Sequence, residues 1–313
     1  PQQPLALKAE VQGNVDHLTL HHLSAAWPGV LSLTAKGEVD ALMQPSRRGR
    51  VHFGLTCGRL GALRTLLPAD VRSTIDVPDG LRASGEASFS GDDYRTQCTV
   101  GSGRGTLAAK AHVNLHSEQY SLMAQAKAFP LQHFVKGMGL GAFTGSLSAS
   151  GRSFDVLSGR ASLAAKAHIA SLAYDTLQLG GLQFDATLRH RRVQAAFTAH
   201  NPLVTARGKL QATLGTARYD AALEADVDSI HLQRLGVTQQ PLIVSTHVQL
   251  QGHTDARFTD YSVQAALRRN IFTTPAKSMM AKDLELQVAA AREHMEARME
   301  AGDLHLQAEA QHD

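Results

Sequence analysis

The sequence predicts an all-β protein, an elongated and curled antiparallel sheet built of tandem repeats with short helical elbows. Apolar and polar residues alternate over many stretches, the links between these stretches are short and polar, and one strand-and-elbow unit recurs along the 313 residues. A period of two indicates a strand with one buried and one solvated face. Short links favour antiparallel neighbours, because parallel crossovers need a dozen residues or more.

The alternation predicts strands in order along the chain. At residues 107–115, apolar side chains such as Leu107 and Val113 point one way, while Lys110 and Asn114 point the other. The same pattern predicts strands at residues 163–169, 182–188, 193–199, 219–227, 242–250 and 261–267. Polar links that suit hairpins lie at residues 116–119, 189–192 and 215–218.

Residues 281–301 fit either a helix or two strands. Their composition favours a helix, and Leu284, Val288 and Met295 fall on one helical stripe. The same residues also alternate, and they align with residues 182–199 at a constant offset of 102 positions (284 − 182). We therefore predict two strands here.

A strand followed by a Leu-rich segment occurs three times. The strands begin at Gly49, Tyr120 and Tyr219, and the Leu-rich segments begin at Leu60, Leu131 and Leu232. One-sided apolar stripes in these segments predict helices of about two turns that dock on the sheet. Such repetition predicts one continuous array with three repeat regions, which are residues 1–128, 129–229 and a truncated 230–313.

Composition narrows the function classes. The net charge is only +3 and aromatic residues make up 5%, so the chain lacks the basic stripe and aromatic platform typical of nucleic-acid binding. No apolar run reaches the ~18 residues of a membrane-spanning helix. The chain opens with Pro1 rather than Met. We expect a segment of a larger protein whose targeting signal and anchor lie outside it.

We expect no enzymatic activity, no cofactor and no metal site. The Gly-rich residues 101–105 precede an alternating strand and lack the strand-loop-helix context of a phosphate loop. On one strand, His17 and His21 would stand about 13 Å apart, too far to share a metal ion. Cys57 and Cys98 fall on apolar phases, which is typical of small buried side chains. A disulfide between them stays open if the compartment is oxidising.

The apolar face of the predicted sheet is rich in alanine. Alanine is a poor strand former with little surface to bury, and a sandwich core needs larger interlocking residues. Leucine alternating with alanine leaves room, so either an opposing protein wall or a molecule that is not protein fills the space. An elongated sheet with one apolar face must curl around something.

Several segments resemble the TamB / AsmA-like family of envelope proteins, which are bridge-like lipid transfer proteins. Residues 13–23 and 28–39 are similar to the family's recurrent unit, in which a glycine precedes regularly spaced leucines and a later glycine precedes a valine. Residues 85–91 (GEASFSG) and 145–151 (GSLSASG) resemble the same unit. The likeness extends over nearly the whole chain and rests on patterns rather than invariant residues.

The resemblance implies a "β-taco", a curled sheet whose concave apolar face forms a groove. It implies that the inward phase of each strand lines this groove. The expected lining residues are Leu107, Val113, Tyr120, Leu122, Leu163, Ile169, Phe184, Leu188, Val193, Phe197, Leu210, Leu223, Val227, Val244, Val248, Leu250, Val263 and Leu267. No catalytic residue carries over, because the family has none.

The implied function is a hydrophobic bridge that carries phospholipid between the inner and outer membranes of a diderm bacterium. The implied location is the periplasm, with an N-terminal helix outside this chain as the inner-membrane anchor. The expected partners are phospholipid acyl chains and, through parts outside this segment, an outer-membrane barrel protein. No nucleic-acid partner is expected.

Three other interpretations stay open at this point. A chaperone-like module could assist outer-membrane protein assembly by holding unfolded strands. The alternation also permits a transmembrane barrel, although the sequence lacks the aromatic girdles of that class, with one Trp and five Tyr. The third is a purely structural spacer.

Overall fold

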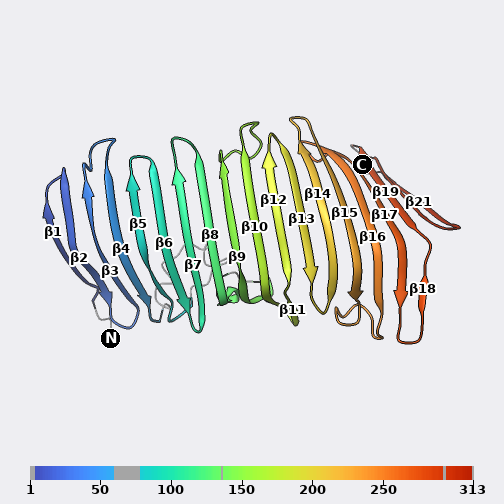
Figure 1. Cartoon of the computed structure of the whole chain (residues 1–313), viewed down its shortest axis with the longest axis horizontal. Coiled ribbons are helices and arrows are strands. Elements are labelled where there is room, and N and C mark those ends of the chain that lie inside the picture. The colour runs from blue at the N-terminus through green and yellow to red at the C-terminus, as the bar shows by residue number, and fades with distance from the viewer. Residues whose placement is uncertain (1–3, 60–77, 135–136, 292–293, 312–313) are drawn as a thin grey trace. The chain divides into compact units, whose positions relative to one another are not determined.

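The computed structural model describes residues 4–59, 78–134, 137–291 and 294–311. These residues form one antiparallel sheet of 21 strands. Strands that follow one another in sequence lie side by side (Figure 1). The predicted all-β, antiparallel fold is therefore confirmed.

The elements have the following bounds. Strands β1 to β9 are Ala6–Gly13, His17–Trp27, Leu31–Asp40, Arg48–Cys57, Arg82–Ser90, Asp93–Ser102, Gly105–Asn114, Gln119–Pro130 and Leu140–Arg152. Strands β10 to β21 are Ser162–Tyr174, Leu177–Leu179, Leu182–Arg189, Arg192–His200, Val204–Leu214, Arg218–His231, Ile243–Asp255, Asp260–Thr273, Ser278–Met280, Leu284–Ala291, His294–Ala301 and Leu304–Gln311. One short 3-10 helix, η1, is Leu131–His133.

The chain divides into two compact units. Unit 1 consists of residues 1–152 and 169–178, and unit 2 of residues 153–168 and 179–313. In unit 1, β1 to β9 pair in chain order. In unit 2, pairing runs from β12 to β17 and on through β19 to β21. The three repeat regions expected from the sequence stay a prediction.

Within this segment, Leu284–Ala291 and His294–Ala301 form strands, as predicted. The hairpin of β19 and β20 begins 102 residues after the hairpin of β12 and β13, at Leu284 rather than Leu182. The two hairpins also share the register that joins the two strands, since Leu182 opposes Ala199 and Leu284 opposes Ala301. The alternation of apolar and polar residues therefore predicted the secondary structure of this segment correctly, whereas its helix-favouring composition did not.

A β-bulge also recurs at the spacing of the predicted repeat. The register of β8 shifts between Ala126 and Phe129, and that of β15 shifts between Val227 and Ile230. The bulge of β15 lies 101 residues after the bulge of β8, at both of its ends (227 − 126 and 230 − 129). Each bulge precedes a Leu-rich segment. Because bulges bend a strand, the shared position indicates that both copies turn in the same way at this point.

The predicted two-turn elbows are wrong in the copies that the structure describes. After β8 only the 3-10 helix η1 forms, and Gly137 and Gly139 with φ of 74° and 66° follow it. The segment after β15 consists of hydrogen-bonded turns and ends at Gly236 with φ of 75°. Glycines in the left-handed region stop helices this short before a second turn forms. The copy at Leu60 lies outside the described residues.

The described strands form a single layer. Strands contact their neighbours within the sheet, η1 contacts β9, and no element lies against a face of the sheet as a second layer. The largest buried cluster centres on Cys57 and Leu81 in unit 1, with Val100 and Phe134 packed against it. No side chain of the described residues is fully buried. The fold therefore depends on strand pairing more than on a central core.

The hairpin links lie close to their predicted positions, but two of the three are shorter than the four residues predicted, since they are residues 115–118, 190–191 and 215–217. His190 and Arg191 join β12 to β13 with φ of 48° and 63°. A two-residue link with both residues left-handed follows the right-handed twist of the strands it connects. Within the Gly-rich residues 101–105, Gly103 and Arg104 likewise form the link between β6 and β7, with Gly103 at φ of 57°.

Candidate functional site on the apolar face

The expected lining residues of unit 2 fall into rows that cross the strands. One row consists of Phe184, Phe197, Gly208, Ala225, Val248 and Leu267. A second consists of Ala195, Leu210, Leu223, Leu250 and Ala265. A third consists of Leu188, Val193, Ala212, Ala221, Gly252 and Val263. Residues opposed across an antiparallel pair share one face, so these three sets, called the apolar rows below, lie together.

Val227 and Val244 belong to the same face. Val227 is two strand periods beyond Leu223 on β15, and Val244 is two periods before Val248 on β16. The structure therefore places every lining residue expected from β12 to β17 on one side of the sheet.

Glycine and alanine allow the larger side chains to lie flat in these rows. A Cβ atom at Gly208 would stand 2.5 Å from the ring of Phe197, so the ring occupies the space that a side chain would take. Aromatic rings thus fill part of the space that alanine, alternating with leucine, leaves on this face. The remaining room is open.

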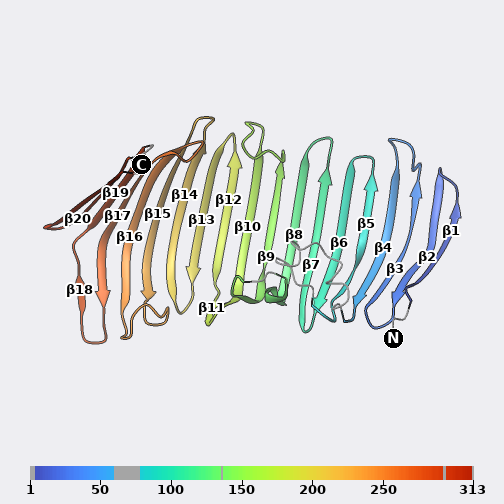
Figure 2. The ribbon, with the colours of Figure 1, turned by 180° about the vertical axis from the view of Figure 1, so that it is seen from behind.

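No strand or helix among the described residues covers the apolar rows. Seen from behind, β12 to β16 form one layer with no second sheet on them (Figure 2). Leu188 is buried, with 5% exposed, whereas Phe184 and Val263 are 43% and 41% exposed. Ala225 is also buried and Ala221 is exposed, and the other residues of the rows are half-buried, because neighbours across the strands shield one another. An opposing protein wall, one of the two expectations, is not found in the part of the chain that the structure describes.

Unit 1 carries an apolar face of the same kind. Val113 opposes Tyr120, Leu122 opposes Ala111, and Leu107 opposes Ala126. These lining residues are half-buried except Leu122, which is exposed. Ile169, in the part of β10 that belongs to unit 1, is half-buried, and so is Leu163, in the part that belongs to unit 2.

A hollow of about 310 Å³ lies on this face of unit 1. Its lining residues include Val51, Ala87, Phe89, Tyr94, Thr96, Ala111 and Val113. The rings of Phe89 and Tyr94 are stacked with centroids 6.3 Å apart. The phenylalanine lies over Gly49, where a Cβ atom would stand 2.8 Å from the ring.

The list of expected lining residues leaves out several residues of the apolar faces. In unit 1 these include Phe53, Leu55, Phe89 and Tyr94, and in unit 2 the second row continues from Ala265 into Leu286, Met299 and Leu306. All of them lie on the apolar phase of alternating strands. Extending the same period-two analysis to every strand would have found them.

The opposite, polar face carries cross-strand pairs of histidine and carboxylate. The pairs with short N–O distances are His17–Asp40, His112–Asp93 and His247–Asp226, at 2.5, 2.6 and 2.9 Å. The hydrogen bond that each imidazole N–H donates is the main cause that lowers the pKa of each aspartate. Sequence reasoning considered His17 only as a possible metal ligand and did not find these histidine–aspartate pairs. The sequence signal that could have revealed these pairs is an acidic residue at the matching position of an adjacent strand.

Asp226 has the densest set of charged partners on the polar face of unit 2. Besides His247, it contacts Arg269 at 3.2 Å and Arg207 at 3.6 Å. These cations lower the pKa of Asp226 further, after the imidazole hydrogen bond. His247 is itself largely shielded, with 13% of its side chain exposed. The polar face is thus connected across β14 to β17.

Other sequence candidates lie apart from one another. His21 bonds Gln12 at 2.8 Å, while His17 bonds Asp40. The described residues contain no group of three or more potential ligands placed to hold a metal ion. Cys57 and Cys98 are both free thiols, on β4 and β6, and burial raises the pKa of Cys57.

Comparison with known proteins identifies no relative. No family model matches the sequence, and no curated protein or solved structure matches it. Within the described ranges, no helix is long and apolar enough to cross a membrane. The apolar faces themselves are therefore the basis for a functional hypothesis.

Proposed function

We propose that the apolar faces form a path for phospholipid acyl chains between the inner and outer membranes of a diderm bacterium. The observation that supports this proposal is the apolar rows of unit 2, which run across β12 to β17 without a protein layer from the described residues over them. Exposed apolar surface of this extent marks interaction with another molecule. The resemblance to the TamB / AsmA-like family points to the same function and to a periplasmic location.

The energetics of acyl chains favour such a path. Each buried methylene is stabilised by about 0.8 kcal/mol, so transfer of a whole chain into water is prohibitive. Movement along a uniform apolar face costs far less, because an acyl chain that leaves one row is covered by equivalent apolar surface at the next. Polar headgroups stay in water. The mechanism requires no catalytic residue.

The test is organic extraction of the chain purified without detergent, followed by mass spectrometry of the extract. We expect stoichiometric phospholipid from the wild type. Leu223→Glu places a carboxylate in the middle row and is expected to abolish it, because a charge in contact with acyl chains is strongly unfavourable. Ala222→Glu is the matched control, since the neighbouring residue of β15 lies on the other face.

An empty wild type with an intact β-sheet circular dichroism spectrum would overturn the lipid proposal. Equal phospholipid in Leu223→Glu and Ala222→Glu would overturn the assignment of the apolar rows. The chaperone-like alternative gives a different outcome, in which photo-crosslinkers at Leu223 capture unfolded outer-membrane protein and no lipid is extracted. Location is tested by fractionation of cells that contain the full-length protein.

A further inference from the structure

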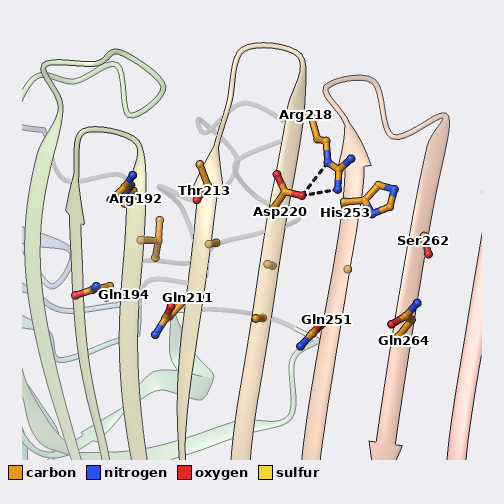
Figure 3. Close-up of a pocket in the computed structure, with 15 residues that line it drawn as sticks. Arg192, Gln194, Gln211, Thr213, Arg218, Asp220, Gln251, His253, Ser262 and Gln264 are labelled. Atoms are coloured by element: carbon orange, nitrogen blue, oxygen red, sulfur yellow. Dashed lines mark hydrogen bonds and ion pairs between the residues drawn. The ribbon is translucent and has the colours of Figure 1, made fainter.

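The polar face of unit 2 contains a hollow of about 560 Å³ over β13 to β17. Two rows of side chains border it. One row is Gln194, Gln211, Ala222, Gln251 and Gln264, and the other is Arg192, Thr213, Asp220, His253 and Ser262. Figure 3 shows these side chains standing on adjacent strands along the hollow. We call the hollow between these rows the amide trough.

The trough crosses strands rather than following one. Adjacent strands are about 4.8 Å apart, so five strands extend over about 19 Å. In the row that contains the four glutamines, Ala222 is the one residue without a long side chain, and it lies in the middle of that row. The geometry therefore fits an extended ligand that lies across the strands and contacts a hydrogen-bonding group on nearly every one.

The four glutamine amides are free to bind. Within the described residues, no side-chain hydrogen bond involves Gln194, Gln211, Gln251 or Gln264, and all four are exposed. By contrast, Gln307 on β21 bonds Glu296 and Glu309. Each amide both donates and accepts hydrogen bonds. Thr213 and Ser262 add hydroxyls with the same double capacity.

The charges in the trough disfavour an anionic ligand. Arg218, which begins β15 beside the second row, donates to Asp220 at 2.8 Å, so the charges of this pair offset each other (Figure 3). Arg192 stands at the end of its row. Tight anion sites use several converging cations or backbone N–H groups, and here the backbone N–H groups belong to the sheet ladder.

A polypeptide fits the trough poorly. Strand addition needs a free sheet edge, and the strands under the trough are paired on both sides. Peptide recognition also needs pockets for apolar side chains, whereas Ala222 is the only apolar residue in the two rows that border the trough. The hollow is also lined by Val193, Ala212 and Ala221, which belong to the apolar rows of the opposite face. Groups that both donate and accept, set at regular spacing with little net charge, match a chain of hydroxyl groups.

We propose that the amide trough binds a linear, uncharged oligosaccharide across β13 to β17, as a second binding site on the face opposite the apolar rows. The proposal does not depend on lipid transport. Its contacts are hydrogen bonds from the glutamine amides and the two hydroxyls, without an aromatic platform. The site therefore recognises a chain of sugars rather than one sugar.

The test is isothermal titration calorimetry of the full chain with cellohexaose and chitohexaose, supported by saturation-transfer NMR. We expect binding of at least one of them. Gln211→Ala combined with Gln251→Ala is expected to weaken it about tenfold, because the hydrogen bonds of two amides to the sugar are lost. Gln97→Ala combined with Gln125→Ala is the matched control, since both glutamines lie on the polar phase in unit 1, outside the trough.

Ala222→Leu tests the room in the trough independently, and we expect it to weaken binding as well. Circular dichroism and phospholipid extraction of each variant exclude loss of fold and effects on the opposite face. Absence of binding for both oligosaccharides overturns the proposal. So does equal binding by the trough variant and its control, or displacement of the sugar by inorganic phosphate, which would indicate an anion site.

Discussion

The two faces of unit 2 share the same strands but differ in how their side chains are partnered. On β15, Leu223, Ala225 and Val227 point to the apolar face, while Glu224 and Asp226 point to the other. The apolar residues meet only small or apolar neighbours in their rows. On the other face, Asp226 is joined to two arginines and a histidine on three other strands. Side-chain cross-links between strands are therefore concentrated on the polar face.

This difference indicates a division of roles within one layer of strands. A sheet with two solvent-facing sides lacks the burial that stabilises a sandwich, so pairing and polar cross-links carry more of its stability. The apolar face is then free to bind a ligand, because the fold does not need it to pack against protein. Changes on the two faces should consequently separate stability from binding.

The largest expected effect on stability comes from adding a side chain at a glycine where the backbones of two strands lie close together on the apolar face. A Cβ atom at Gly85 would stand 2.3 Å from the backbone oxygen of Gln97 and 2.9 Å from Cα of Cys98. Gly85→Ala must separate β5 from β6, and we expect the unfolding free energy to fall by about 1–3 kcal/mol. The measurement is the urea midpoint followed by circular dichroism.

The matched control is Gly54→Ala on β4. A Cβ atom there meets only the Thr34 hydroxyl oxygen at 3.0 Å, and that side chain can rotate. We expect little change in the midpoint. Equal destabilisation by both substitutions would contradict the close approach at Gly85.

A smaller effect is expected from removing the central charge of the polar face. Asp226→Asn keeps the shape of the side chain but loses its charge toward Arg207, His247 and Arg269. We expect a lower urea midpoint with unchanged phospholipid extraction. Glu224→Gln, which loses only the contact to His247 at 3.5 Å, is the control and should change the midpoint less. Loss of lipid in Asp226→Asn would contradict the separation of roles.

The histidine pairs predict a dependence on pH. The pKa values of Asp40, Asp93 and Asp226 are lowered in the folded state from an ordinary value of 3.8. A lowered folded-state pKa contributes stability that is present above the unfolded value and is lost as pH falls through the folded pKa. We therefore expect the urea midpoint to decrease below about pH 4.

His112→Gln tests the origin of this slope, because the imidazole hydrogen bond is the main cause at Asp93. We expect a shallower fall of the midpoint in acid than in the wild type. His190→Gln, in the hairpin link of β12 and β13, is the control. An unchanged slope in His112→Gln would show that the pair does not contribute.

The strands were predictable and their cross-strand partners were not. A period of two is a local property, so it predicted both the hairpin at residues 284–301 and the phase of residues such as Leu223 and Val248. The partner of Asp226 depends on the register between two strands, which alternation alone does not fix, because any even shift keeps the phase. The Leu-rich elbows failed because glycines such as Gly236 end them within a single turn.

The smallest expected effect is a change in the rate at which maleimide modifies the two cysteines, which serve as probes of the apolar face. Cys98 lies on that face between Gly85 and Ala109 and is half-buried, whereas Cys57 is buried with 4% exposed and a raised pKa. Because the thiolate is the reactive form, we expect maleimide to modify Cys98 under native conditions and Cys57 only after unfolding. Phosphatidylglycerol vesicles should slow the reaction of Cys98 if acyl chains lie along this face. Mass spectrometry of the modified chain measures both rates. If Cys98 reacts at the same rate with and without vesicles, unit 1 does not belong to the proposed lipid path. The path would then be confined to the apolar rows of unit 2.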